Sequence, residues 1–182
     1  MLDIPLTMLH EHLNGDNIPF FPCPDGYRVR SFVAGDAEVW ARIEAAAGAF
    51  SDQDAARRHF AMEFAPVHAC LPGRMLFLEH GSAGPIGTTT AWAGEFAGEV
   101  WGRIHWVGIV PAFQGQGLSK PLLSAALTRL TMDYRQAYLT TETTSYRGIN
   151  LYLSFGFMPC VTNDRDREGW AIVEEVLGRT IL

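Results

Sequence analysis

The stretch from His105 to Leu123 constrains the fold of this chain more than any other, because it combines strand, turn and helix patterns. The residues from Trp106 to Val110 are mostly β-branched or aromatic, which favours a buried strand. Pro111 has no N–H to donate to a neighbouring strand, so we expect the strand to end there. Apolar residues then recur at helical spacing, at Leu118, Leu122, Leu123, Ala126, Leu127 and Leu130. The stretch therefore predicts a strand that leads through a short turn into a helix.

The turn between this strand and this helix carries two glycines, Gly115 and Gly117. Glycine allows a tight turn and lets a ligand approach the bare backbone. Pro121 fits the first turn of the helix, where its missing N–H is not needed. Because the free N–H groups at the start of a helix attract negative charge, we predict an anion-binding site at this turn.

Two familiar phosphate sites fit the turn poorly. The P-loop pattern GxxxxGK[ST] does not occur anywhere in the sequence. The dinucleotide pattern GxGxxG belongs early in a βαβ unit, with an acidic residue about twenty positions later. Here Gly115-Gln-Gly117 stands late in the chain, after three strands with an antiparallel pattern. The anion must therefore be identified from other features of the sequence.

Length and composition predict one globular domain in the cytoplasm. The 182 residues are 48% hydrophobic and 19% charged, which is an ordinary balance for a single domain. No apolar run approaches the length of a membrane span, and the start of the chain lacks a secretion signal. The net charge of −6 argues against a nucleic-acid surface. We therefore expect neither nucleic acid nor membrane as a partner.

The cysteines and histidines do not form a metal-binding pattern. Cys23, Cys70 and Cys160 are scattered without a CxxC pair, as expected of reduced thiols. His10 and His12 flank Glu11, but residues two apart on a helix point in different directions, and no third ligand is evident. We therefore expect no metal.

Residues 1–25 are punctuated by prolines and predict an N-terminal extension with one short helix from Thr7 to Leu13. Residues 26–182 then alternate between strands and helices, with Asp36 and Ser51 expected to cap the first two helices. The predicted strands are residues 27–33, 74–79, 86–92, 100–110, 137–143 and 157–161, and the predicted helices are 37–47, 51–64, 118–132, 145–155 and 168–177. This order predicts an α/β (α+β) fold with antiparallel front strands and a βαβ crossover. The sequence leaves open whether the last helix packs on its own sheet or on a second subunit, so a homodimer is one alternative.

Two segments of the chain resemble the signatures of one family. Gln114-Gly-Gln-Gly117-Leu-Ser119 resembles the Q/R-x-x-G-x-G/A signature of the GNAT N-acetyltransferase superfamily, which binds the pyrophosphate of coenzyme A. Ile149-Asn-Leu-Tyr152-Leu-Ser-Phe-Gly156-Phe157 is similar to the second signature of that family, a helix that ends in Tyr-x-x-x-Gly-Phe. The resemblance covers about residues 27–159 and implies a central mixed sheet flanked by helices.

The resemblance implies acetyl-CoA as cosubstrate, and it implies which residues hold it. These are Ile109, Val110, Gln114, Gly115, Gln116, Gly117, Leu118, Ser119, Lys120, Asn150 and Tyr152. The sequence departs from the family where Ser119 replaces glycine or alanine, and where Gln114 and Gln116 replace basic residues. Backbone amides do most of the anion binding at such a turn, so these departures leave the site intact. Lys120 is either a phosphate contact or a solvated lysine.

The chemistry implied by the resemblance is direct attack of an acceptor amine on the acetyl group in a ternary complex. The N–H groups around Ile109 and Val110 would polarise the carbonyl. Tyr152 occupies the family's general-acid position, and a phenol keeps its proton at neutral pH. His105 matches, by its offset from Gln114, a histidine that removes a proton in the arylalkylamine branch of the family. By period two it shares a strand face with Arg103 and Val107. Glu142 is a rival base, and a water chain is a third alternative.

The acceptor cannot be identified from the sequence. Several carboxylates lie near where the family builds its acceptor site, which favours a cationic amine: Glu44, Asp52, Asp54, Glu63, Glu95 and Glu99. A small-molecule amine is the main prediction. The alternatives are a protein amine and a non-catalytic module that binds or senses acyl-CoA.

Overall fold

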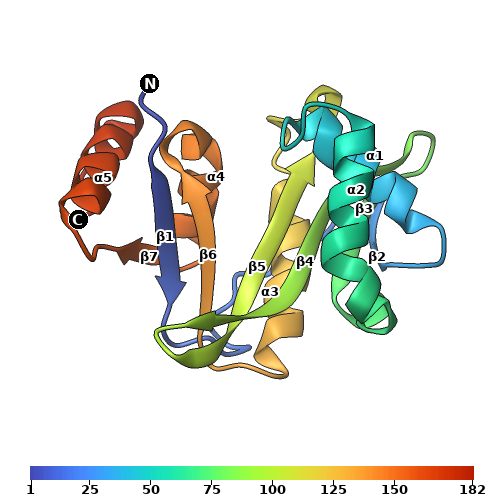
Figure 1. Cartoon of the computed structure of the whole chain (residues 1–182), viewed down its shortest axis with the longest axis horizontal. Coiled ribbons are helices and arrows are strands. Elements are labelled where there is room, and N and C mark those ends of the chain that lie inside the picture. Colours follow the sequence, from blue (N-terminus) through green and yellow to red (C-terminus); the bar gives the residue numbers. More distant parts are fainter.

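The chain folds around one mixed β-sheet (Figure 1). The computed structural model describes residues 1–182. Its strands are β1 (Pro5–His10), β2 (Tyr27–Ser31), β3 (Met75–His80), β4 (Gly84–Phe96), β5 (Glu99–Ile109), β6 (Ala137–Glu142) and β7 (Met158–Cys160). Their order in the sheet is β2-β3-β4-β5-β6-β1-β7. β2 to β5 pair antiparallel in sequence order, whereas β5 and β6 are parallel. The predicted α/β class, with antiparallel front strands and a βαβ crossover, is therefore confirmed.

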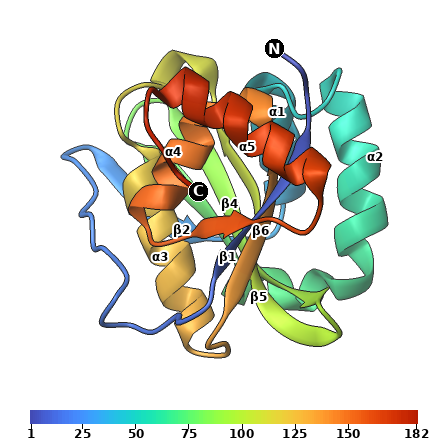
Figure 2. The same ribbon diagram turned by 90° about the vertical axis from the view of Figure 1, so that its left-hand side faces the viewer.

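Five helices flank the sheet. They are α1 (Asp36–Ala47), α2 (Gln53–Phe64), α3 (Ser119–Thr131), α4 (Tyr146–Ser154) and α5 (Asp164–Leu177). α1 and α2 lie on one face of the sheet and α3 and α4 on the other, as the side view in Figure 2 shows. None of these helices combines the length and the apolar character that crossing a membrane would require.

The two largest of three apolar clusters lie on the two faces of the sheet. The cluster under α1 and α2 includes Trp40, Ile43, Phe60, Phe64 and Phe77. The cluster under α3, α4 and α5 is larger and includes Leu6, Leu123, Leu127, Ile149, Tyr152 and Trp170. Trp170 is completely buried, so α5 packs on the sheet of its own chain. That answers the question about the last helix that the sequence left open.

The helix predicted from Thr7 to Leu13 is wrong, because residues 5–10 form strand β1. β1 lies between β6 and β7 and pairs antiparallel with both. Leu6, Met8 and His10 alternate as its buried side chains, and the sheet supplies partners from more than a hundred residues away. Such distant pairing outweighs the weak helical preference of a short segment. β1 belongs to the same sheet as strands from residues 26–182. The predicted division into an extension of residues 1–25 and a domain of residues 26–182 stays a prediction.

Three helices begin differently from the prediction. α1 starts at Asp36 after Gly35, and the Asp36 carboxylate accepts a hydrogen bond from the Val33 N–H at 2.7 Å instead of capping. Asp52, not Ser51, caps α2 by accepting from the Ala55 N–H at 2.7 Å. Asn163 caps α5, so this helix begins at Asp164 and not at residue 168 as predicted. In α2 and α5 a neighbouring side chain satisfies a free N–H group of the first turn, whereas α1 has no side-chain cap.

Candidate active site

A cleft opens where β5 and β6 part. The two strands pair only at Gly102 with Ala137 and at Arg103 with Tyr138, and they diverge beyond these pairs (Figure 1). A cavity of about 1010 Å³ fills the opening, with lining residues from β5, β6, α4 and the turn before α3. Because parallel strands normally pair along their length, this early divergence exposes backbone and side chains of both strand ends to a ligand.

The glycine-rich turn presents a row of unpaired amides at one end of this cleft. The N–H groups of residues 115–119 donate to no other backbone group of the chain, and the first hydrogen bond of the helix comes from Lys120 to the Gly117 carbonyl. Gly115 and Gly117 both have φ near 75°, a left-handed conformation that favours glycine. Leu118, which precedes α3, has no side-chain cap. Five adjacent amides at a helix start have the geometry expected of an anion site, which stays a prediction from the sequence.

The two glutamines of the turn do not act as free donors to this site. The Gln114 side-chain amide donates to the Ile109 carbonyl at 2.7 Å, which ties the turn to the end of β5. The Gln116 amide lies 3.4 Å from the Ala112 carbonyl, and Gln116 does not line the cleft. Ser119 and Lys120 both line it. The Lys120 ammonium also lies 5.0 Å from the centre of the Phe21 ring.

Two arginines that the sequence did not single out also line the cleft. Arg147 comes from α4, and Arg179 follows α5. The Arg179 guanidinium donates to the Asn150 side-chain oxygen at 2.8 Å, which brings the predicted site residue Asn150 together with a cation. With Lys120, these residues surround the cleft with positive charge although the chain as a whole is acidic. No sequence spacing relates Arg179 to the other two, so only the fold reveals this cluster.

Ile109 supplies the backbone amide at the inner end of the cleft. The Val110 N–H donates to the Ile86 carbonyl at 2.9 Å, and Val110 does not line the cleft. Neighbouring residues of a strand direct their N–H groups to opposite sides. The Ile109 N–H therefore points toward the cleft, and of the two predicted carbonyl-polarising amides only this one is available.

A bulge in β5 changes which side chains share a face. The register between β4 and β5 shifts next to Trp106, which has the unusual φ of 51° for a residue with a side chain. As a result His105 and Trp106, although consecutive, both reach Glu63 on α2, while Val107 packs in the opposite cluster. The prediction that His105 shares a face with Val107 is therefore wrong, because a strand keeps period two only while its pairing is regular.

Glu63 holds the His105 ring in place. Its carboxylate is 2.6 Å from His105 Nε2, and it also contacts Trp106 Nε1 at 2.9 Å and His59 Nε2 at 2.8 Å. Burial alone would raise the pKa of Glu63, but the hydrogen bonds from these partners lower it to about 2. Burial, opposed by the contact with Glu63, lowers the pKa of His105 below its ordinary value. An ionised carboxylate only accepts, so Nε2 carries the hydrogen and Nδ1 is left to accept a proton.

His105 also stands between two cavities. It lines the main cleft, and it lines a second, open pocket of about 410 Å³ with Met62, Glu63 and His59. Its side chain is only 13% exposed. The predicted base is therefore in the cleft, with a partner on α2 that the sequence suggested only as an acceptor carboxylate. The spacing of His59 and Glu63, four residues apart on one helix, was the available signal for this cluster.

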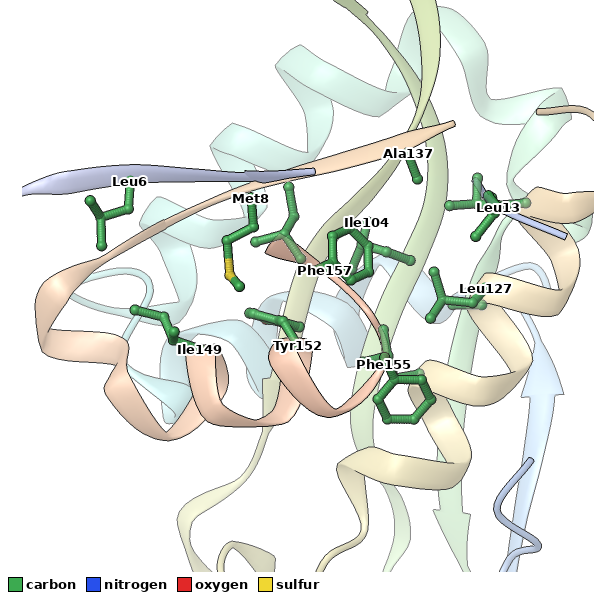
Figure 3. Packing of buried hydrophobic residues seen from close by; sticks show 14 of the residues in the cluster. Leu6, Met8, Leu13, Ile104, Leu127, Ala137, Ile149, Tyr152, Phe155 and Phe157 are labelled. Atoms are coloured by element: carbon green, nitrogen blue, oxygen red, sulfur yellow. The ribbon is translucent and has the colours of Figure 1, made fainter. Parts of the chain in front are cut away.

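Tyr152 reaches the cleft from α4 and is mostly buried in the large apolar cluster (Figure 3). Its hydroxyl lies 3.8 Å from where a Cβ on Gly148 would be, so it points back along α4 beside another residue that lines the cleft. Burial, with smaller contributions from the charges of Glu44 and Glu142, raises the pKa of Tyr152 above its ordinary value. The phenol is therefore protonated at neutral pH, and a tyrosine that lines the cleft can donate a hydrogen bond or a proton to a ligand there.

Two carboxylates line the cleft in different surroundings. Glu142 is exposed at the end of β6 and accepts a hydrogen bond from the Ser145 hydroxyl at 3.1 Å. Glu44, on α1, is 2% exposed, and burial raises its pKa to about 8. Nowhere in the chain do three or more His, Cys, Asp or Glu side chains gather in a group that could hold a metal ion.

Comparison with known proteins identifies an acetyltransferase domain in this part of the chain. The family model of the acetyltransferase (GNAT) domain matches residues 72–159, which include β5, the glycine-rich turn and α4. The chain is 28% identical over 163 residues to a mycothiol acetyltransferase of Streptomyces coelicolor, covering 88% of this chain and 51% of that protein. It is 29% identical over 163 residues to another from Geodermatophilus obscurus, covering 84% and 51%. The chain thus spans about half the length of the curated relatives it matches.

Solved structures show the same fold. A GCN5-related N-acetyltransferase of Sphaerobacter thermophilus superposes with a TM-score of 0.64 at 25% identity, covering 87% of this chain and 48% of that one. An acetyltransferase of the GNAT family from Colwellia psychrerythraea has a TM-score of 0.63 at only 9% identity, with coverages of 88% and 55%. The second likeness concerns the fold alone.

Proposed function

Since this chain belongs to the GNAT superfamily of acetyltransferases, we propose that it transfers an acetyl group from acetyl-CoA to the primary amine of a small-molecule acceptor. One observation carries the proposal. Five unpaired amides lie at one end of the cleft between β5 and β6, and the Tyr152 phenol lies within the same cleft. The amides suit the phosphate end of a substrate, and the protonated phenol in the same cleft suits a leaving group that must gain a proton.

The turn and the surrounding cations hold the cosubstrate. The amides of residues 115–119 bind the pyrophosphate, and Lys120, Arg147 and Arg179 add positive charge around it. Acetyl-CoA supplies the acetyl thioester. The Ile109 N–H donates to the thioester oxygen and stabilises the negative charge that develops there during attack.

Two side chains move the protons. His105 Nδ1 takes the proton that the amine loses as its nitrogen bonds to the carbonyl carbon, while Glu63 holds the ring through Nε2. Tyr152 gives its proton to the thiolate when the carbon–sulfur bond breaks. The phenol is suited to this role because its raised pKa keeps it protonated until a strong base forms beside it.

The comparisons support acetyl transfer and do not identify the acceptor. The curated relatives are named for the acetylation of mycothiol, but the chain matches only about half of their length at under 30% identity. Identity at this level supports acetyl transfer in general. A protein amine as acceptor and a non-catalytic acyl-CoA sensor are outcomes that the experiment must separate.

The test is the release of free thiol from acetyl-CoA by the purified protein in the presence of pooled primary amines. We expect amine-dependent release and a stoichiometric amount of acetylated amine by mass spectrometry. Binding of CoA without release under any amine would favour the sensor. Release only with peptides would replace the small-molecule acceptor with a protein amine.

A further inference from the structure

Glu44 provides the only carboxyl oxygen in the chain that is buried without a hydrogen-bond partner. The residue is 2% exposed and lines the cleft. Asp36, which is also on α1, is similarly buried. In contrast to Glu44, its carboxylate accepts hydrogen bonds from the Arg30 guanidinium at 2.9 Å and from the Val33 N–H at 2.7 Å. Buried polar groups are almost always paired, so the Glu44 carboxyl is left for a group that the chain does not contain.

The neighbouring strand is shaped to admit this carboxyl. A Cβ added to Gly108 would come within 2.9 Å of Glu44 Oε1 and 3.3 Å of Oε2, so any other residue there would push the carboxyl away. Gly108 precedes Ile109, whose N–H faces the inner end of the cleft. The carboxyl is therefore held beside the place where the proposed function positions the acetyl group.

No cation of the chain neutralises Glu44. The other titratable side chains that line the cleft are Arg103 and His105 on β5, Lys120 on α3, Glu142 on β6, Arg147 and Tyr152 on α4, and Arg179 after α5. None of these side chains makes a hydrogen bond to Glu44 Oε1, and His105 is already paired with Glu63. Burial alone accounts for the raised pKa of Glu44, and its charge in turn disfavours ionisation of Tyr152. A cation bound beside Glu44 would lower the pKa of Glu44 and reduce the effect of its charge on Tyr152.

We propose that Glu44 binds the ammonium group of the acceptor and so selects cationic amines over neutral ones. This inference rests on the proposed function for its acceptor, but the binding site itself is defined by geometry. An ammonium has three N–H donors, which suits a carboxyl with unused lone pairs in a cavity. The other carboxylates near the cleft are less available, because Glu63 is engaged by three partners and Glu142 is exposed.

The first experiment detects binding without catalysis. The carboxyl groups of glutamate are labelled with ¹³C in the full chain, and Glu44 is assigned from the signal that is lost in Glu44→Gln. We expect methylammonium, the smallest primary ammonium, to lower the pKa of Glu44, because a bound cation favours the ionised form. Tetramethylammonium at equal ionic strength has no N–H to donate and should leave the pKa unchanged. No difference between the two salts would overturn the inference.

The second experiment measures selectivity during turnover. Benzylamine is cationic at neutral pH and aniline is neutral, so their KM values report the contribution of charge. We expect Glu44→Gln to raise KM for benzylamine by about tenfold or more, with KM for aniline and both kcat values nearly unchanged. Glu38→Gln, an exposed carboxylate on the same helix, is the matched control and should change neither. A fall in kcat with KM unchanged would overturn the binding role.

The two experiments also separate this inference from the proposed function. Methylammonium binding at Glu44 without thiol release from any amine would support the site and contradict acetyl transfer. Thiol release with equal KM values in wild type and Glu44→Gln, together with no methylammonium effect, would support acetyl transfer and remove Glu44 from acceptor binding.

Discussion

Replacing Glu44 with glutamine should remove the pH dependence of stability that this residue creates. The folded state holds the Glu44 proton up to about pH 8, whereas the unfolded chain releases it near 4.5. Between these values the folded state binds more protons than the unfolded state, so its stability falls as the pH rises. Below about pH 4.5 Glu44 is protonated in both the folded and the unfolded state, so its burial as a charge no longer lowers the free energy of unfolding. Glutamine does not titrate and should remove this slope.

The magnitude follows from the two pKa values. A difference from 4.5 to about 8 corresponds to about 5 kcal/mol of lost stability above pH 8. This is an upper limit, because water in the cleft can reach one side of the carboxyl. Glutamine would itself be a buried amide without partners, which costs about 1–3 kcal/mol at every pH. The variant should therefore be less stable than wild type at pH 5 and more stable, by about 2–4 kcal/mol, at pH 8.5.

Urea unfolding followed by tryptophan fluorescence at both pH values measures this difference, and Glu38→Gln serves as the control for a carboxylate lost from the surface of the same helix. The decisive quantity is the change in sign of the stability difference between Glu44→Gln and wild type. Parallel pH profiles for the two proteins would show that Glu44 titrates normally and that its burial is not as described.

Three further predictions follow from the site and the fold. Tyr152→Phe should lower turnover by roughly 10- to 1000-fold while CoA affinity, measured by calorimetry, stays the same; equal losses in both would refute the general-acid role. The carboxylate of Glu63 raises the pKa of His105, so Glu63→Gln should move the acidic limb of the kcat/KM profile to lower pH, and His105→Ala should abolish that limb. If neither variant moves the limb, Glu142 or water is the base. Met8→Ala, at a fully buried position of β1, should reduce the free energy of unfolding by about 2–5 kcal/mol in urea, whereas Leu2→Ala at an exposed position should have almost no effect; a loss as small as that of Leu2→Ala would mean that β1 is not packed in the sheet.

The sequence is most informative where local rules act. Gly115 and Gly117 mark a turn, and the apolar spacing after Leu118 marks a helix, so the row of free amides follows from the order of the residues alone. Tyr152 is found from the resemblance of its segment, which ends in Gly156 and Phe157, to a signature of the family. The predicted βαβ crossover follows from the order of these local elements, and the sheet confirms it.

What the sequence could not provide depends on partners far apart in the chain. β1 is a strand because β6 and β7 lie on either side of it, and nothing within residues 5–10 indicates those partners. The bulge at Trp106 needs the mismatch with β4, and it brings Trp106 to the same side as His105, where both side chains reach Glu63. In the sequence Glu44 is one of several carboxylates expected near the acceptor site, and nothing distinguishes it from the others. Only packing against Gly108 shows that it is buried and unpaired.

The central claim is that the amides of residues 115–119 hold the pyrophosphate of CoA, and calorimetric titration of CoA into wild type and Gly117→Val tests it. Valine is strained at the φ of 75° that Gly117 adopts, so the row of amides should be distorted. Gly98→Val carries a comparable strain at φ 81° in the β4–β5 turn, away from the cleft, and controls for folding. We predict that CoA binds wild type and Gly98→Val alike and binds Gly117→Val at least about tenfold more weakly. Equal CoA affinity in all three proteins would contradict the account.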